Sequence, residues 1–359
     1  MRRFFSFLFI LSLFYFIVTL LVFPLETVTA AKDAIRLCLD VVIPSLFPFL
    51  VCSHLLLSLG ITGWLSRFAS PLMRPLFGVP GSGALAVMLG FVSGYPVGAS
   101  TIAGLYRTGH LTKTEAHRLL TFCNNAGPLF VLGAVGVGML GNQKLGILLY
   151  LSHILSALVV GILFRHWGRN SASSSPTLPP AHYEKNFFGA LGNAVADSVD
   201  TILKICGFVI LFAVFTAGLP ELPITPLLYG ILEITGGIPA IVNAGIFPAT
   251  YLLPAISFFL ALSGLSILFQ TAAIILPAGL SLKPYLLGKL LQGIFSFLFT
   301  LLFCKIFLIS APASHIETLS IPPTPEQLFA MATALSLFLV FLLFFLWLIA
   351  FLHKKRLNE

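Results

Sequence analysis

Two clusters of Gly, Pro, Ser and Asn interrupt long apolar stretches in the first half of the chain. They read SGYPVGAS at residues 93–100 and FCNNAGPLF at residues 122–130. Inside a bilayer every backbone N–H and C=O group needs a partner within the protein, so a helix broken by Gly and Pro is tolerated only where it lines a cavity or is buried in protein. The two clusters therefore indicate a binding site built from broken membrane helices.

A weaker pair of interruptions occurs in the second half of the chain. It reads EITGGIPAI at residues 233–241 and LSGLSILFQ at residues 262–270. Paired breaks in the two halves of a membrane protein are a sequence signature of a transport site near the bilayer midplane. One break would equally fit a kinked buried helix, whereas four breaks in paired positions favour transport.

The broken segments offer the chemistry to hold an anion. A helix that begins near Pro96, or one that begins at Pro239, would present free backbone N–H groups and the positive end of its dipole. Asn124 and Asn125 add amide donors and acceptors, although local helix capping explains them equally well. We therefore predict that the substrate touches residues of the breaks, namely Ser93, Gly94, Tyr95, Val97, Gly98, Asn124, Asn125, Gly236, Gly237, Ser263 and Ser266.

Ionisable residues within apolar spans are functional candidates by default. Lys204 lies one turn after Asp200, which fits either an i,i+4 ion pair or a counter-ion for a substrate carboxylate, and we include Lys204 in the predicted site. Glu233 precedes a break and is our candidate for a coupling cation or proton, or else it marks the water boundary. His54 and His153 are lone histidines on apolar segments, which favours packing over ligand binding.

The composition places most of the chain in a membrane, because 58% of the residues are hydrophobic and only 9% are charged. The net charge of +8 comes from basic clusters between apolar runs, which fits the positive-inside pattern and not a nucleic-acid-binding domain. The five cysteines lie in apolar segments and read as buried thiols. Motifs of zinc proteases, serine hydrolases and ATPases do not occur, so we expect no enzyme, cofactor or metal site.

The apolar runs predict an all-α polytopic membrane protein with about eight transmembrane helices and two re-entrant hairpins. We predict spans at 4–23, 37–60, 116–140, 145–164, 195–218, 250–278, about 283–308 and 328–352, and hairpins at 82–105 and 227–246. A cleaved signal peptide is the alternative for 4–23, but this run exceeds the usual apolar core of a signal peptide. Basic residues on both sides of 82–105, including Arg67 and Arg74 in a predicted loop, favour a hairpin over a full span.

The order span, hairpin, broken span, span occurs twice, which predicts two inverted repeats at about 35–165 and 190–310. A transmembrane span within 1–34 precedes the first repeat, a polar cytoplasmic linker at 166–189 separates the repeats, and 311–359 carries a final span and a basic tail. Capping boxes at 112–115 and 324–327 predict helix starts. This count places both termini in the cytoplasm.

At SGYPVGAS and at LTKTEAHRLLTFCNNAGPLFVLGAVGVGML (residues 111–140) the sequence resembles the sporulation integral membrane protein YlbJ family, also called stage V sporulation protein V. This family is part of the group with Gate or nucleoside-recognition domains, so both repeats would be Gate-like. The resemblance is specific over 35–165 and fainter over 190–310. It implies movement of dipicolinic acid, a small planar dianion, from the mother cell toward the forespore, across the cytoplasmic membrane or the mother-cell-derived outer forespore membrane.

We therefore expect a transporter of a small anionic solute that works by alternating access between its repeats. The expected partners are the anionic substrate and the lipid bilayer, with no nucleic acid; a coupling proton or sodium ion and oligomer formation stay open. Two alternatives remain. One is a nucleoside or nucleobase carrier, and the other is a non-transporting factor that organises spore-envelope proteins.

Overall fold

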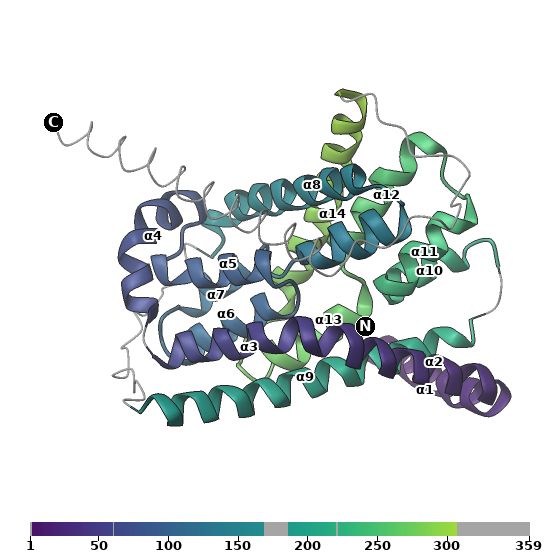
Figure 1. The fold of residues 1–359 in the computed structure, drawn as a ribbon, viewed down its shortest axis with the longest axis horizontal. Coiled ribbons are helices and arrows are strands. Elements are labelled where there is room, and N and C mark those ends of the chain that lie inside the picture. Colours follow the sequence, from purple (N-terminus) through teal and green to yellow (C-terminus); the bar gives the residue numbers. More distant parts are fainter. Residues whose placement is uncertain (1, 60, 169–185, 220–221, 307–359) are drawn as a thin grey trace.

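Helices make up all the regular secondary structure in the computed structural model, which describes residues 2–59, 61–168, 186–219 and 222–306. Most of the long helices run along one common direction (Figure 1). Five helices in the described ranges are long and apolar enough to cross a membrane, or six if one bent pair counts as a single span. The prediction of an all-α polytopic membrane protein is confirmed.

The chain begins with α1 (Arg2–Val22) and continues into one helix of 35 residues, Pro24–Ser58. This helix comprises α2 (Pro24–Leu37), a π-helical turn η1 (Cys38–Val42) and α3 (Ile43–Ser58). At 1.5 Å per residue it is roughly 50 Å long, which exceeds the ~30 Å hydrocarbon core of a bilayer. The span predicted at 37–60 is thus only the second part of a longer element.

The segment that carries Arg67 and Arg74 forms a helix, α4 (Ile61–Phe77), where the sequence analysis predicted a loop. Pro71 and Pro75 lie inside this helix, and internal prolines disfavour helix formation, which explains the wrong prediction. The following segment, the 3₁₀ turn η2 (Gly81–Gly83) and α5 (Ala84–Val92), meets α4 at 92°. Figure 1 shows α4 lying across one end of the bundle.

The first hairpin consists of α5 and α6 (Val97–Arg107), separated by the predicted break at 93–96. α7 (Lys113–Leu120) then begins at a confirmed capping box, in which Thr112 and Glu115 bind each other's backbone N–H groups. Residues 121–127 are not helical, and the π-helical η3 (Leu129–Met139) follows. α8 (Gln143–Leu163) and the short η4 (Phe164–His166) complete this half. The span predicted at 116–140 is therefore two short helices around a long break.

The second half has no counterpart of α4 among the described residues. It contains α9 (Phe187–Ala217), the hairpin of α10 (Thr225–Leu232) and α11 (Ile234–Ala244), the broken pair α12 (Ala249–Leu262) and α13 (Gly264–Ile275), and α14 (Leu282–Ile306). The break at Ser263-Gly264 is as predicted. Residues 169–185 of the linker predicted at 166–189 fall outside the described residues, as do the final span at 328–352 and the capping box at 324–327. The last residues of the predicted linker, 187–189, already belong to α9.

The break of the second hairpin lies at Glu233 and not at 235–239 as predicted. Gly236, Gly237 and Pro239 are all inside α11, so no helix begins at Pro239. The reason is a helix cap. The Glu233 carboxylate accepts the N–H groups of Thr235 and Gly236, which lets the helix start before the glycines.

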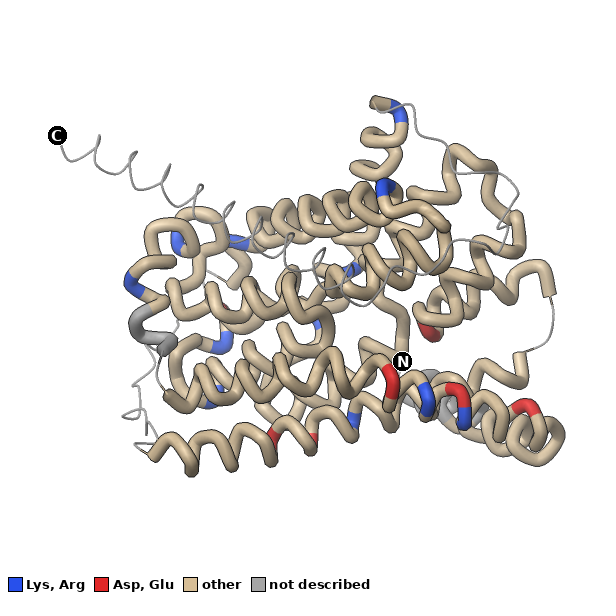
Figure 2. The backbone as a smooth tube through the Cα atoms, viewed as in Figure 1, with Lys and Arg blue, Asp and Glu red and all other residues tan. Residues whose placement is uncertain are grey.

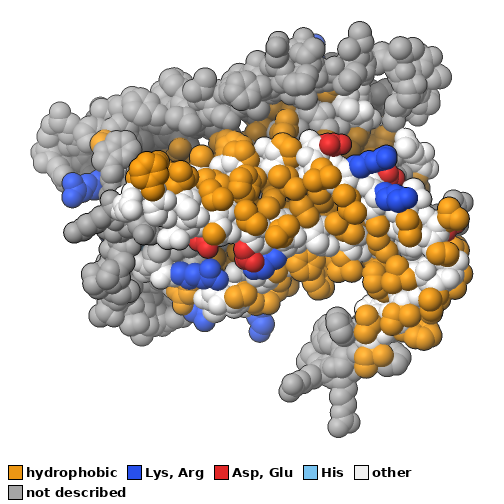
Figure 3. All heavy atoms as spheres, turned by 60° about the horizontal axis from the view of Figure 1, so that its bottom comes forward, with side chains coloured by type: hydrophobic (Ala, Val, Ile, Leu, Met, Phe, Trp, Pro, Cys, Tyr) orange, Lys and Arg blue, Asp and Glu red, His pale blue; other side chains and the backbone are white. Residues whose placement is uncertain are grey.

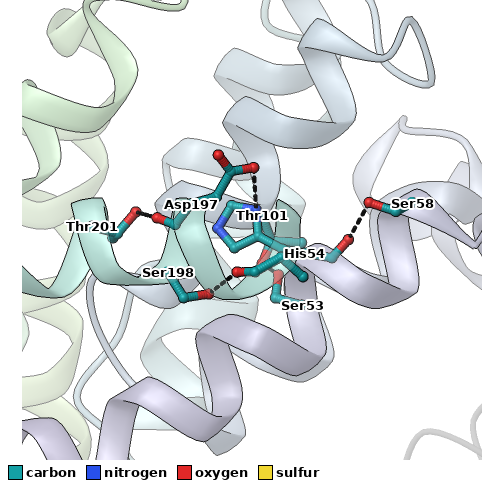
Figure 4. A network of polar contacts seen from close by, with 8 residues as sticks. Ser53, His54, Ser58, Thr101, Asp197, Ser198 and Thr201 are labelled. Carbon is teal, nitrogen blue, oxygen red and sulfur yellow. Dashed lines mark hydrogen bonds and ion pairs between the residues drawn. The ribbon is translucent and has the colours of Figure 1, made fainter. Parts of the chain in front are cut away.

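The two halves pack along their long helices. α9 lies against α2 and α3, while α14 lies against α8 and α12. His54 of α3 and Asp197 of α9 approach to 3.9 Å, and Ser53 of α3 shares a hydrogen bond of 2.8 Å with Thr101 of α6 (Figure 4). Each half therefore holds its first long helix against the other half.

The outer face along these helices is mostly apolar, as expected for contact with lipid tails (Figure 3). Exposed side chains on α9 include Leu203 and Leu211. Lys and Arg residues gather at the end of the bundle where α4 lies (Figure 2). The fold thus presents an apolar belt with a basic end.

Candidate functional site

A buried lysine on α14 lies where the two halves meet. Lys289 is only 2% exposed. Its ammonium group donates hydrogen bonds to Gln292 Oε1 at 2.9 Å and to Asn125 Oδ1 at 3.3 Å. Among the described residues no carboxylate forms an ion pair with it. Burying a charge is costly unless an opposite charge compensates it, so this position is suited to receive an anion.

Asn125 connects the break of the first half to α14. Its Oδ1 atom also accepts a hydrogen bond from Gln292 Nε2 at 2.8 Å, and its Nδ2 atom donates to the carbonyl of Phe122 at 2.6 Å. Gln292 Nε2 lies 3.4 Å from the carbonyl of His153 on α8. Because residues 121–127 are not helical, the Asn125 side chain can reach across to the other half.

Asn124 makes a second connection, to the break of the second half. Its Nδ2 atom donates to Thr271 Oγ1 at 2.9 Å and lies 3.4 Å from the hydroxyl of Tyr285. That hydroxyl shares a hydrogen bond of 3.2 Å with Ser263 Oγ, at the break between α12 and α13. The structure thus brings together three predicted site residues, Asn124, Asn125 and Ser263, around α14.

Several buried polar atoms near the breaks have no hydrogen-bond partner among the described residues. His153 Nε2 accepts the N–H of Ala126 at 3.1 Å, which places the ring proton on Nδ1, and Nδ1 itself has no partner. Buried polar atoms without partners are rare in proteins. These atoms can bind a polar ligand: Ser93 Oγ, Tyr95 Oη, Asn124 Oδ1, His153 Nδ1 and Gln270 Oε1.

The glycines of the first hairpin allow its backbone to touch the break that follows. A Cβ atom on Gly90 or on Gly98 would lie 1.8 Å or 2.2 Å from the carbonyl oxygen of Cys123. Gly94 adopts a φ of +90°, and a Cβ there would lie 2.7 Å from the backbone nitrogen of Gly127. The predicted substrate residues Gly94 and Gly98 are therefore in contact with residues 123–127.

The second half has a comparable contact between its hairpin and its break. A Cβ on Gly264 would lie 3.4 Å from the carbonyl oxygen of Ile231, at the hairpin tip. Gly237 packs against Gly230 inside the hairpin, whereas Gly236 faces only the Glu233 carboxylate. In both halves, the tip of the hairpin adjoins the break of the next helix pair.

Three other predicted site residues lie away from Lys289. Lys204 forms an i,i+4 ion pair with Asp200 on α9, and its side chain is 48% exposed. Val97 packs into an apolar cluster with Leu50 and Ile202. Ser266 is buried on α13, where its Oγ lies 3.4 Å from Gln270 Nε2.

The sequence analysis missed Lys289, Gln292, Tyr285, Thr271 and the polar role of His153. Lys289 lies near the start of the span predicted at about 283–308, and the sequence analysis gave it no role. The sequence signal that identifies the residues on α14 is a stripe of polar residues at helical spacing on an otherwise apolar helix. The buried residues on this face of α14 are Tyr285, Gly288, Lys289, Gln292, Ser296 and Thr300.

The described residues contain no group of three His, Cys, Asp or Glu side chains placed to hold a metal ion. The chemistry available at this site is hydrogen bonding by amides and hydroxyls together with one buried ammonium group. Such a set of groups binds and orients a polar solute.

Comparisons with known proteins place the chain in a family. Residues 39–164, from η1 to α8, match the family model described as Gate, nucleoside recognition. The chain is 35% identical over 340 residues to the sporulation integral membrane protein YlbJ of Bacillus subtilis (strain 168), and the match covers 83% of each chain. No solved structure matches. The protein is therefore an integral membrane protein that belongs to the family of the sporulation integral membrane protein YlbJ.

Proposed function

We propose that this chain is a transporter that carries a small anionic solute across a membrane by alternating access, and that in sporulating cells the solute is dipicolinic acid. The observation that carries the proposal is Lys289, an ammonium group that is buried among amides between the two halves and has no described carboxylate partner. The name of the relative in Bacillus subtilis, a sporulation membrane protein, supports the physiological setting.

The side chains around Lys289 fit a planar dicarboxylate. One carboxylate of the solute accepts charge-assisted hydrogen bonds from Lys289 and an amide bond from Gln292. The ring of Tyr285, whose centroid lies 5.9 Å from the Lys289 ammonium, offers an aromatic surface beside that carboxylate. Tyr95 and His153 supply further donors, the hydroxyl and the Nδ1–H that have no described partner.

Binding at this position exchanges one contact between the halves for another. In the structure, Asn125 of the first half accepts hydrogen bonds from Lys289 and Gln292 of the second half. A carboxylate that takes these donors frees Asn125 from α14. The solute then weakens a link between the halves, which is the step that alternating access requires.

A nucleoside or nucleobase carrier is the second candidate, because residues 39–164 match a family model described as nucleoside recognition. A neutral base would use the amides of Asn124, Asn125 and Gln292 and would not need the charge of Lys289. The third candidate, a non-transporting factor in assembly of the spore envelope, requires none of these polar groups to face a solute.

The direct test is uptake of labelled dipicolinate by the purified full chain in sealed liposomes, with and without excess unlabelled nucleoside. We expect saturable uptake that uridine and adenosine leave unchanged. Loss of uptake in the presence of nucleoside would favour the second candidate. No uptake of either solute by correctly inserted protein, under imposed proton and sodium gradients in both directions, would contradict a transport function.

The proposal also includes an orientation. Both termini lie in the cytoplasm and the two halves have inverted topology, with the membrane being the mother-cell-derived outer forespore membrane or the cytoplasmic membrane. Support comes from the repeated order of elements and from the basic end of the bundle near α4. Labelling of single cysteines at positions 144 and 165 with a membrane-impermeant reagent tests it, because these positions lie at opposite ends of α8.

A further inference from the structure

A second site lies at the basic end of the bundle, away from Lys289. The segment after α4, the start of α7 and the end of α8 enclose a cavity of about 360 Å³. Its lining includes Arg74, Gly78, Glu115, Arg118, Arg165 and His166. Three arginines from three separate segments of the chain thus surround one cavity.

Hydrogen bonds to backbone carbonyls hold two of these arginines in place. Arg118 donates to the carbonyl of Gly78 at 2.5 Å and to that of Trp167 at 2.9 Å. Arg165 donates to His166 Nε2 at 2.8 Å and lies 3.5 Å from the carbonyl of Pro75. Arg165 contacts these two acceptors through Nε and Nη1 only. A guanidinium has five N–H donors in a planar fork, so Arg165 has donors to offer a ligand with several acceptor oxygens.

Two of the arginines that line the cavity carry positive charges that no ion pair among the described residues neutralises. Neither Arg74 nor Arg165 forms an ion pair with a described residue. The lining includes one carboxylate, Glu115, and it is engaged in the α7 capping box, where Oε2 accepts the N–H and the hydroxyl of Thr112. Arginine forks match phosphate oxygens in geometry as well as in charge.

The position of the cavity relative to the membrane indicates where its ligand comes from. The chain turns by 92° between α4 and α5, and α4 lies across the end of the apolar bundle (Figure 1). A helix that crosses the end of membrane-spanning helices lies at the depth of the lipid headgroups. The exposed Phe68 and the basic Arg74 are both on this helix.

We propose that this arginine cavity binds a phosphate group, supplied by the headgroup of an anionic phospholipid or by a soluble phosphate compound. Arg74 and Arg165 donate to the phosphate oxygens, Arg118 lines the same cavity, and α4 carries Arg74 at headgroup depth. The site is independent of transport through the centre. It gives the protein a preference for membranes with anionic lipids at this surface.

The test measures lipid retention by the full chain. The protein is reconstituted in vesicles of equal parts phosphatidylglycerol and phosphatidylcholine, solubilised gently, and examined by native mass spectrometry. We expect selective retention of phosphatidylglycerol, reduced about tenfold in the double variant Arg74→Gln/Arg165→Gln. Lys144→Gln is the control and is matched in charge to the single variants Arg74→Gln and Arg165→Gln, because it removes one positive charge from an exposed residue at the other end of α8.

Thermal unfolding with inorganic phosphate separates the two sources. Stabilisation by phosphate without retention of phosphatidylglycerol would assign the cavity to a soluble phosphate compound. Equal retention of both lipids together with no effect of phosphate would overturn the proposal, as would an equal loss of retention in Lys144→Gln. Arg74→Gln alone changes a single exposed side chain, so it serves if the double variant does not fold.

Discussion

The two hairpins have the same place in their halves but differ in charge. The tip of the α5/α6 hairpin, Ser93–Pro96, has no acidic residue, and the hydroxyls of Ser93 and Tyr95 have no described partner. The tip of the α10/α11 hairpin is Glu233, whose carboxylate already accepts the N–H groups of Thr235 and Gly236. The α5/α6 hairpin can therefore offer hydrogen-bond donors to an anionic solute, whereas in the α10/α11 hairpin the Glu233 carboxylate already occupies the backbone donors.

This difference shows that a repeated order of helices does not produce a symmetric binding site. A helix N-terminus favours a negative charge, but at α11 the protein already provides that charge. The buried positive charge, Lys289, lies on α14 and contacts Asn125 of the first half. The anion in our proposal thus lies between the break of the first half and α14, and not at the tip of the second hairpin.

The largest effect is expected for Lys289→Met, which removes the buried charge while retaining a long apolar side chain. We expect uptake of dipicolinate to fall by about 100-fold, because truncating one partner of a buried charge pair costs a few kcal/mol. Thermal stability should stay equal or increase, since an uncompensated buried charge is removed. Lys144→Met at the exposed start of α8 is the control. Unchanged uptake in Lys289→Met would exclude Lys289 from the site.

A smaller loss is expected for Asn125→Ala, which removes the acceptor that links the first break to Lys289 and Gln292. We expect uptake to fall by about tenfold with the amount of membrane-inserted protein unchanged, since a hydrogen bond to a charged group contributes about 1.5–3 kcal/mol. Asn243→Ala, at an exposed position of α11, is the matched control. Equal uptake by both variants would remove Asn125 from the site.

Glu233→Gln tests the second hairpin directly. The amide keeps one acceptor for the N-terminus of α11 but removes the negative charge. If the carboxylate repels a bound anion, the KM for dipicolinate should decrease about threefold, the size expected for one charge near a helix end. A loss of proton- or sodium-dependent uptake with the KM unchanged would instead identify Glu233 as the coupling residue.

The smallest effect concerns pH and a contact outside the spans. His117 of α7 accepts the N–H of Ser281 at 3.0 Å, and burial, with a smaller contribution from Lys113, lowers its pKa from the ordinary value of 6.5. Because its pKa is lowered in the folded state, His117 stays neutral at a pH at which the unfolded chain binds a proton. The contribution of His117 to the free energy of unfolding is therefore complete above pH 6.5 and declines as the pH falls below that value.

We therefore expect the Tm of the wild type to be lower at pH 5.5 than at pH 7.5, and His117→Gln to reduce that difference. The difference should not vanish, because burial also lowers the pKa of His110 in the preceding loop. A Tm difference that is the same in both proteins would show that the contact with Ser281 does not sense pH.

The sequence predicts the positions of the breaks well because Gly and Pro have local effects on the backbone. The breaks at 93–96, at 124–128 and at Ser263-Gly264 all occur where these residues cluster. The break at Glu233 was misplaced because the cap depends on a side chain that bonds backbone two and three residues ahead. Of the two nearby glycines, Gly237 packs against Gly230 inside the hairpin.

The central site could be predicted only in part. Asn124 and Asn125 stand out because amides are unusual inside apolar segments. Lys289 does not stand out, because a lysine near the start of a span normally marks the membrane surface. Its burial results from the packing of α14 against α8 and the first break, contacts between residues more than 130 positions apart, such as Gln292 and His153. Such long-range contacts cannot be predicted from the local sequence around Lys289.

The close contact of glycines with backbone atoms limits which amino acids the chain can accept. At Gly90 and Gly98 a single methyl group would overlap the carbonyl oxygen of Cys123. At Gly192 and Gly207 on α9 a Cβ atom would meet nothing within 4 Å. A saturation library of this protein, selected for function, should thus be empty at the first pair of positions and richly populated at the second, although all four are glycines within membrane helices.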